Sequence, residues 1–350
     1  MHARWIRRVG IAAIALAMPL LAWCGVAAGA DGLRPIAGPL DAEGSFAFEG
    51  SRKDVRESRR ALSGIACPSA RPGPLGCIVV FDEGIEARAV TLGERSYTAE
   101  LTPIVLLSGG EELDAEAAAS DGHYVYVTGS HARKRGGCEV NPDSGQVLRF
   151  RVDPVTFLPL RSPAEETPTR RLGEIMAALP ALAPHVGRCP GEGGVDIEGM
   201  AARDGRLFFG FREPTVGEAA YVLSVDATRL FEGGDVNPLL ASVRVGRGRG
   251  IRDLVAVKDG ILILAGPDDE KNARIAWTVS LWEGSAPAGG PAVPKLLAAL
   301  DLGDIERRKC DKRPKPEAMA VLAETPDRYR VAVLSDGLCD GGPLIFDLRR

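Results

Sequence analysis

Four stretches of the chain place an acidic residue at the start of an apolar, strand-like segment. The acids are Glu116, Glu198, Asp253 and Glu317. In the first three stretches an Asp-Gly turn follows, and a second apolar strand comes after it. Carboxylates are the ligands that a hard cation such as Ca²⁺ prefers, and they also pair with arginine. Either chemistry requires that these scattered acids lie close together.

Each stretch has the pattern of a β-hairpin, in which the start of the first strand and the end of the second lie at one edge of the sheet. The leading acids should therefore share an edge with residues that end the second strands. This geometry predicts a polar face with the following ligand-binding candidates: Glu116, His131, Glu198, Arg212, Arg249, Arg252, Asp253, Glu317 and Asp336. Among them Glu198, Asp253 and Glu317 are the candidate metal ligands, and Ca²⁺ is the metal they would suit.

The segment Gly246–Asp253 places Arg249 and Arg252 directly before a leading acid. Guanidinium groups bind carboxylate or phosphate through two parallel hydrogen bonds, so an anionic ligand is one interpretation. The alternative is purely structural, with acids and arginines joined in internal salt bridges that hold the repeats in register. The spacing of the glycines matches no nucleotide-binding fingerprint.

The repeat also predicts the architecture. Further strand-like runs follow each hairpin, which gives groups of about four strands, the size of a propeller blade. Counting the groups predicts an all-β propeller of five blades, with six as the alternative because residues 152–195 could contain another. We expect a short helix at 172–179 within that insertion. The segment 45–48 is expected to add the missing strand of the last blade and close the ring.

The N-terminus has basic residues, then an apolar run, then Ala28-Gly29-Ala30, as in a secretory signal peptide. We therefore expect a signal peptide at 1–30, a single domain at 31–350 and a periplasmic or secreted location. The formal net charge of -4 gives no reason to expect nucleic acid or a membrane surface as partner. We expect a monomer.

Six cysteines follow the predicted signal peptide, and an even number in an exported chain indicates disulfides. No Cys-x-x-Cys pair is present, which argues against a zinc site. Order along the chain favours the pairs Cys67–Cys77, Cys138–Cys189 and Cys310–Cys339, each flanking one repeat.

The motifs resemble those of a bacterial family of unknown function, DUF3616. The similar segments are 114–116 with 125–131, Asp196-Ile-Glu-Gly-Met200, 248–254, 264–267 and 316–319. The resemblance implies a propeller-like fold and brings no established activity. The segment Asp196–Met200 also looks like inner strands of esterase-like phytase and calcium-dependent nucleotidase propellers, which would imply calcium and phosphoesters.

Three functions remain open from the sequence. The first is an exported propeller that binds a small or polymeric anionic ligand, with Ca²⁺ as a second ligand. The second is a calcium-dependent hydrolase of phosphoric or carboxylic esters, although no nucleophilic serine motif is present. The third is a scaffold for envelope proteins without a small-molecule site.

Overall fold

The structure is a computed structural model that describes residues 1–2, 32–110, 112–269, 274–286 and 289–350. One compact unit runs from Gly32 to Arg350. The predicted signal peptide lies almost entirely outside the described residues. Within the described residues, no helix combines the length and apolar character needed to cross a bilayer.

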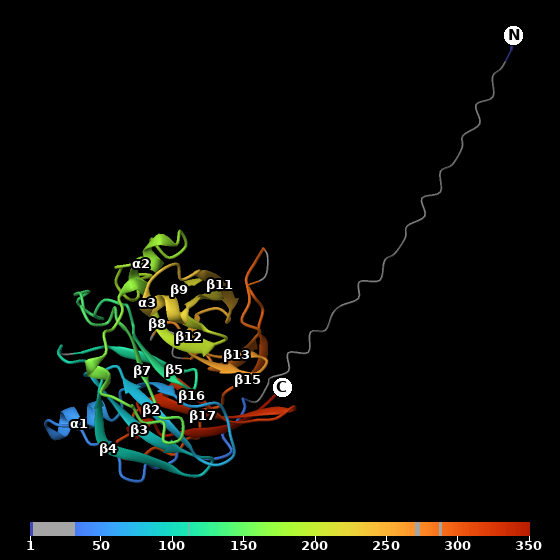
Figure 1. Cartoon of the computed structure of the whole chain (residues 1–350). Coiled ribbons are helices and arrows are strands. Elements are labelled where there is room, and N and C mark those ends of the chain that lie inside the picture. The colour runs from blue at the N-terminus through green and yellow to red at the C-terminus, as the bar shows by residue number, and fades with distance from the viewer. Residues whose placement is uncertain (3–31, 111, 270–273, 287–288) are drawn as a thin grey trace. The chain divides into compact units, whose positions relative to one another are not determined.

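The compact unit is a five-bladed β-propeller built from antiparallel sheets (Figure 1), as the sequence predicts. Three sheets have four strands each. They comprise β1 (Leu62–Ala66), β2 (Leu75–Phe81), β3 (Glu86–Leu92) and β4 (Tyr97–Val105); then β8 (Asp196–Arg203), β9 (Arg206–Val216), β10 (Ala219–Asp226) and β11 (Leu239–Arg244); then β12 (Arg249–Val257), β13 (Gly260–Pro267), β14 (Thr278–Trp282) and β15 (Lys295–Ala299).

The remaining two sheets have three named strands each. They comprise β5 (Ala115–Ser120), β6 (Tyr124–Gly129) and β7 (Val147–Arg151), then β16 (Lys315–Glu324), β17 (Arg328–Asp336) and β18 (Leu344–Arg349). In chain order these sheets are blade 2 and blade 5, and the four-stranded sheets are blades 1, 3 and 4. The first strand of each blade is its inner strand, and the inner strands contact one another in the cyclic order β1, β5, β8, β12 and β16.

The blades are held together by apolar side chains on both faces of each sheet. The strands are rich in Val, Leu, Ile and Phe, and in β13 every residue up to Gly266 is buried. A separate hydrophobic cluster lies between each pair of neighbouring blades, including the pair formed by blade 5 and blade 1. Because every sheet is covered on both faces, the strands show runs of apolar residues rather than strict alternation.

Residues near the N-terminus of the compact unit close the ring. The Ile36 N–H donates to the Ile345 carbonyl at 2.7 Å, and the Ile345 N–H donates to Ala37 at 2.9 Å, so this segment extends blade 5 beyond β18. The prediction that 45–48 would do so was wrong. Phe46 is instead buried in the cluster between blades 5 and 1, and Phe48 packs against the same cluster. These contacts explain the alternating apolar pattern of the segment 45–48.

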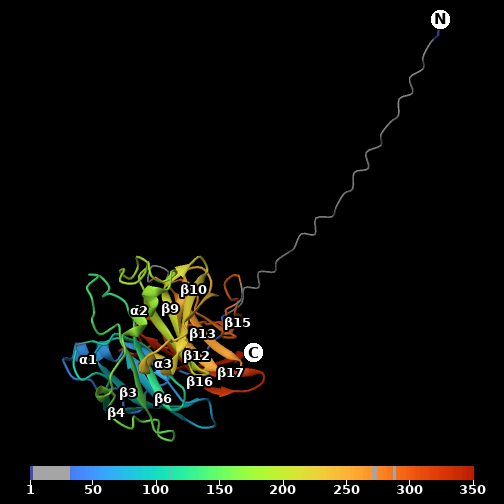
Figure 2. The same cartoon turned by 45° about the horizontal axis from the view of Figure 1, so that its top comes forward.

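Short helices lie in the connections: α1 (Arg52–Ser58), η1 (Pro163–Glu165), α2 (Arg171–Ala178), α3 (Ala227–Glu232) and η3 (Cys339–Gly341). The expected helix at 172–179 is confirmed as α2, which buries Leu172 and Met176 on one side. Both views place α2 at the outside of the propeller, away from the inner strands β12 and β16 (Figures 1 and 2).

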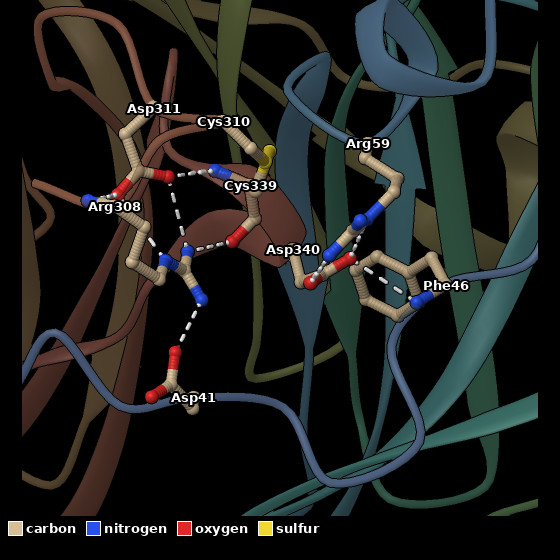
Figure 3. Close-up of a disulfide and its surroundings, with 8 residues drawn as sticks. All are labelled: Asp41, Phe46, Arg59, Arg308, Cys310, Asp311, Cys339 and Asp340. Atoms are coloured by element: carbon tan, nitrogen blue, oxygen red, sulfur yellow. Dashed lines mark hydrogen bonds and ion pairs between the residues drawn. A yellow bond between two sulfur atoms is a disulfide. The ribbon is translucent and has the colours of Figure 1, made fainter. Parts of the chain in front are cut away.

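All three predicted disulfides are present: Cys67–Cys77, Cys138–Cys189 and Cys310–Cys339. Figure 3 shows the surroundings of the third. Arg308 contacts Asp311 at 3.2 Å and reaches Asp41 in the N-terminal segment at 2.7 Å. The carboxylate of Asp311 also accepts a hydrogen bond from the Cys339 N–H at 2.8 Å. This disulfide therefore lies in a network that ties the closing segment to the last blade.

Asp340, the neighbour of this disulfide, is buried and binds two other segments (Figure 3). One carboxylate oxygen accepts from Arg59 Nε at 2.8 Å and from the Phe46 N–H at 3.1 Å, and the other accepts from Arg59 as well. One carboxylate thus joins blade 5, the end of α1 and the N-terminal segment.

We predict that Asp340→Asn lowers the free energy of unfolding by about 2 kcal/mol, because hydrogen bonds to a buried charge are lost. The amide keeps the shape and tolerates the left-handed backbone of this residue, φ 58°. Urea denaturation checks this, with the exposed Asp304→Asn as the control. Equal midpoints for the two variants would contradict the role assigned to Asp340.

Candidate functional site

Each inner strand has a β-bulge near its start, and the extra residue of each bulge is polar. These residues are Ser63, Glu116, Glu198, Arg252 and Glu317, one from each blade. A bulge places two residues opposite one and re-aims a side chain, a common device near binding sites. We call these five residues the bulge ring. The member from blade 4 is Arg252 and not the predicted Asp253.

Arg252 is the member of the bulge ring that joins two others. Its Nε lies 2.7 Å from Glu198 in blade 3, and its terminal nitrogen bonds to Glu317 in blade 5. Glu198 also accepts from Arg212 at 2.7 Å. All four side chains are buried. Burial pushes the pKa of Glu198 up, but the two arginines outweigh it and hold the pKa below its usual value.

Glu317 shares Arg252 with Glu198, and nearby cations balance the negative charge of Glu317 less well than that of Glu198. Burial raises the pKa of Glu317 to about 8, although Arg252 opposes the shift. The nearby Asp336 adds repulsion and is itself paired with Lys315 at 2.8 Å. Glu317 therefore holds a proton at neutral pH more readily than Glu198 does.

Two further acids stand two positions before ring members on β5 and β8. Burial raises the pKa of Asp114 to about 6, opposed by a hydrogen bond from Ser130. Burial and Glu198 raise the pKa of Asp196 to about 7. Asp196 contacts Arg135 at 2.6 Å, which reaches over from the loop after β6.

The side of the ring formed by blades 1 and 2 is acidic. Burial raises the pKa of Asp82 and of Glu116 well above their usual values, with added repulsion between these two groups and from neighbouring acids. One oxygen of Asp82 is enclosed and has no hydrogen-bond partner among the described residues. The charge around this end of the channel is therefore uneven: Arg212, Arg252 and Lys315 accompany the acids of blades 3 to 5, and the carboxyl groups of Asp82 and Glu116 lie in blades 1 and 2.

Asp253 has a structural role. Its two oxygens accept from the Leu254 N–H at 2.7 Å and the Met319 N–H at 2.6 Å, and Met200 donates a further backbone hydrogen bond. Burial raises the pKa of this carboxyl well above its usual value, and these backbone hydrogen bonds oppose the shift. Asp253 thus links the inner strands of blades 3, 4 and 5.

Two of the predicted site residues lie apart from this ring. His131 has a left-handed backbone, φ 57°, and its N–H donates to the Ser144 carbonyl at 3.0 Å. Burial, with Arg170 nearby, lowers the pKa of His131 to about 4, so its imidazole is neutral at pH 7. Arg249 donates to the Ala276 carbonyl at 2.8 Å and does not contact the ring acids.

The predicted metal ligands do not form a metal centre in this arrangement. Among the described residues, the acidic, Cys and His groups close enough to share one ion are Cys310, Asp311 and Cys339. The two sulfurs of that group form a disulfide and are not available. Glu198, Asp253 and Glu317 do not come within a shared coordination distance.

A pocket of about 350 Å³ opens on the cationic side of the bulge ring. Its wall includes the indole of Trp277, which packs over Gly266 where any side chain would clash with the ring. The lining residues are Arg212, Arg252, Pro267, Asp269, Trp277, Arg313, Pro314, Lys315 and Glu317. Arginine, lysine and an aromatic wall together suit an organic anion.

The other end of the central channel is different in character. A cavity of about 420 Å³ is lined there by all five inner strands, mostly with Ala, Val, Ile, Leu and Met. Its charged residues, at or beside the turns that follow those strands, are Asp121, Arg203, Asp204, Lys258 and Glu324. The end where the inner strands begin differs in that its charged residues Glu198, Arg212, Arg252 and Glu317 are buried.

Several residues of the site escaped the sequence analysis, among them Asp114, Asp196, Trp277, Arg313 and Lys315. The two aspartates and Lys315 each stand two positions before a glutamate of the bulge ring. Side chains two positions apart on a strand lie on the same face, so these residues could have been predicted. Trp277 has no such signal, because its position depends on the packing of its ring over Gly266.

The shifted pKa values predict how stability depends on pH. Glu317, Asp196 and Asp114 have folded pKa values above their unfolded ones. Their contribution is full below the unfolded values and is lost as the pH rises through the folded values, so stability should fall between about pH 5 and pH 8.

A matched pair of variants tests the raised pKa of Glu116 against the lowered pKa of Glu198. Glu116→Gln mimics the protonated acid and should match wild type at pH 5 and be more stable at pH 8. Glu198→Gln removes a charge from a buried ion pair and should cost about 3–5 kcal/mol at both values. Thermal melts at the two pH values measure both. A Glu116→Gln variant that is destabilised at pH 8 would refute the assignment.

Comparison with known proteins adds a family and several distant structures. No curated protein matches the chain. The GH43_1 enzyme from Xanthomonas citri has a TM-score of 0.41 at 9% identity, with 84% of this chain and 88% of that chain covered. The major Malassezia sympodialis allergen Mala s 1 has a TM-score of 0.42 at 9% identity, with 84% and 93% covered. An arabinanase from Bacillus subtilis has a TM-score of 0.40 at 10% identity, with 82% and 94% covered.

These similarities are too distant to carry an inference about activity. The family described as "Protein of unknown function (DUF3616)" matches residues 163–340, which is half of the chain. That region contains the ring members Glu198, Arg252 and Glu317 and the whole lining of the pocket beside them. The resemblance seen in the sequence motifs is thereby confirmed, and the chain belongs to the DUF3616 family.

Proposed function

We propose that this protein binds an organic anion at the polar end of its central channel. The observation that carries the proposal is the pocket of about 350 Å³ where Arg212, Arg252, Arg313 and Lys315 surround an aromatic wall. Charge-assisted hydrogen bonds from arginine and lysine are among the strongest that a protein offers to a carboxylate or phosphate.

The internal ion pairs support this function. Glu198 holds Arg212 and Arg252 from one side, with their nitrogens 2.7 Å from its oxygens, so neither guanidinium has to be ordered when a ligand arrives. Groups that are already fixed lose little conformational entropy on binding. The structural and functional interpretations of the charged residues are therefore compatible, since the same ion pairs order the arginines.

We further propose that the protein acts outside the cytoplasm. Three disulfides join its six described cysteines, and such bonds persist in oxidising compartments. The predicted signal peptide at 1–30 agrees with this location.

Binding can be tested by thermal melting of the mature protein with millimolar citrate, phosphate or acetate at constant ionic strength. A specific ligand raises the midpoint by mass action. Lys315→Gln should lose most of that rise, because it removes a cation from the pocket lining. The control is Lys295→Gln on the outer strand β15, which should keep the full rise.

Citrate and phosphate also stabilise proteins in general, through exclusion from the surface. An equal rise in wild type and Lys315→Gln would therefore attribute the effect to exclusion and count against the pocket.

We infer that the anion, and not a calcium ion at Glu198, Asp253 and Glu317, is the ligand of this face. The inference is supported by the arginines on the first and third of these carboxylates and by the backbone amides on the second. We predict equal melting midpoints in calcium and in a chelator. A midpoint that falls in chelator for wild type, but not for Glu198→Gln, would contradict the inference and restore the metal.

A further inference from the structure

A loop from blade 2 carries a cation to the start of blade 3. We call residues 132–138, in the connection after β6, the strap. A terminal nitrogen of Arg135 in the strap lies 2.6 Å from a carboxylate oxygen of Asp196, the first residue of β8. The side chain of Asp196 is 4% exposed and that of Arg135 is 44% exposed. The strap therefore brings a cation from the surface to a buried acid.

The carboxylate of Asp196 lies between two guanidinium groups. The oxygen that contacts Arg135 is 3.8 Å from Arg212, which lines the anion pocket. Arg135 therefore balances part of the negative charge of Asp196 that would otherwise balance Arg212. Acids also surround Asp196: Glu198 on β8, Glu213 opposite it on β9, and Asp114 and Glu116 at the start of β5.

The Cys138–Cys189 disulfide anchors the strap to the segment before β8. Cys138 lies three residues after Arg135, and Cys189 lies seven residues before Asp196. Residues 134–137 of the strap are exposed. Fixing an exposed loop costs conformational entropy, which a half-exposed ion pair does not offset by itself. We infer that the disulfide keeps Arg135 in place.

This disulfide differs from the other two in its access to solvent. Cys138 and Cys189 are both partly exposed. Each of the other disulfides has one buried cysteine, since Cys77 is 2% exposed and Cys339 is 0% exposed. A thiolate must reach a sulfur atom to open a disulfide, so access limits the reaction. A dithiol should therefore reduce Cys138–Cys189 before the others.

We propose that Cys138–Cys189 is a redox-sensitive lock that holds Arg135 on Asp196 and so sets the charge beside the anion pocket. A thiolate of a dithiol attacks one sulfur and the S–S bond breaks. Two electrons and two protons pass to the sulfurs of Cys138 and Cys189, and the dithiol becomes a disulfide. Once the strap is released, an ionised Asp196 balances Arg212 instead. The effect on anion binding rests on the proposed function, and the effect on Asp196 does not.

The protonation of Asp196 distinguishes this role from a general loosening of the loop. Burial and Glu198 raise the pKa of Asp196 to about 7, and Arg212 and Arg135 oppose the shift. At pH 5 Asp196 is protonated and its contact with Arg135 is not an ion pair, whereas at pH 8 it is. Removal of Arg135 raises the folded pKa further, so it costs stability at pH 8 and little at pH 5.

Graded reduction tests the lock. The mature protein is treated with increasing dithiothreitol and alkylated under native conditions, and mass spectrometry of its peptides identifies the cysteines that have reacted. We expect Cys138 and Cys189 to react at a dithiothreitol concentration about tenfold lower than the other four cysteines. If another disulfide opens first, or if all three open together, the lock is wrong.

Arg135→Gln tests where the strap acts. We expect the melting midpoint to fall by about 2 °C at pH 8 and by less than half of that at pH 5. The control is Arg133→Gln, which removes the same charge from the strap. Arg133 donates to the carbonyl groups of Gly187 and Cys138, which do not titrate, so its loss should act alike at both pH values.

A double-mutant comparison links Arg135 to the disulfide. In a Cys138→Ser/Cys189→Ser variant the strap is already released, so Arg135→Gln should have no further effect at pH 8. An equal effect of Arg135→Gln with and without the disulfide would show that the disulfide does not hold Arg135. If the serine variant does not fold, the comparison uses protein that has been selectively reduced and alkylated.

Titration calorimetry with citrate connects the lock to the pocket. Wild type and the serine variant are compared at one pH at a time, so the charge of citrate is the same in each comparison. We expect the variant to bind citrate about threefold more weakly at pH 8 and nearly as well as wild type at pH 5. Equal affinities at pH 8 overturn the link to the pocket. If wild type binds neither citrate, phosphate nor acetate, the proposed function fails, and the reduction and melting experiments still decide whether the lock exists.

Discussion

The central interaction of this propeller is the buried guanidinium of Arg252 between Glu198 and Glu317. It connects blades 3, 4 and 5 at the axis, where the inner strands begin. Two negative charges so close together inside a protein would repel strongly, and one arginine alone would be costly to bury. Arg212 is a second cation beside Glu198, and burial raises the pKa of Glu317 to about 8, which limits the repulsion between the two acids. The pocket depends on this arrangement, because the same two arginines form part of its lining.

The apolar clusters between blades and the charged ring at the axis have different roles. Burial of apolar surface between every pair of neighbouring blades supplies most of the driving force for folding. This apolar burial does not by itself determine the chemistry at the end of the channel where the inner strands begin. Polar residues at the bulges do so, and their side chains lie in an environment where unpaired charges are unfavourable. Burial, with added repulsion from neighbouring acids, raises the pKa values of Asp82 and Glu116.

The fold was largely predictable from the sequence, and the site in part. The repeated hairpins indicated five blades and the edge where Glu198 and Glu317 meet, because strand direction alone places them there. Asp253 was misplaced by one residue, since a bulge changes which side chain faces the channel and leaves no trace in a pattern of period two. His131 was misplaced because its left-handed backbone directs it to the 144–145 loop. Trp277 could not be found, since its role depends on contact between two strands.

Among the described residues, one glycine makes the sector of blade 4 unlike the other blades. Opposite the starts of the inner strands, the other blades have Asp82, Ser130, Arg212 and Asp336, and blade 4 has Gly266. Five equivalent repeats would generate five equivalent surfaces around an axis, none of them able to hold an asymmetric molecule in one orientation. Because Gly266 has no side chain, the ring of Trp277, the residue directly before β14, fits over it and makes one sector unlike the rest. Variation at that one position would therefore change the shape of one sector while the frame of the other four blades stays the same.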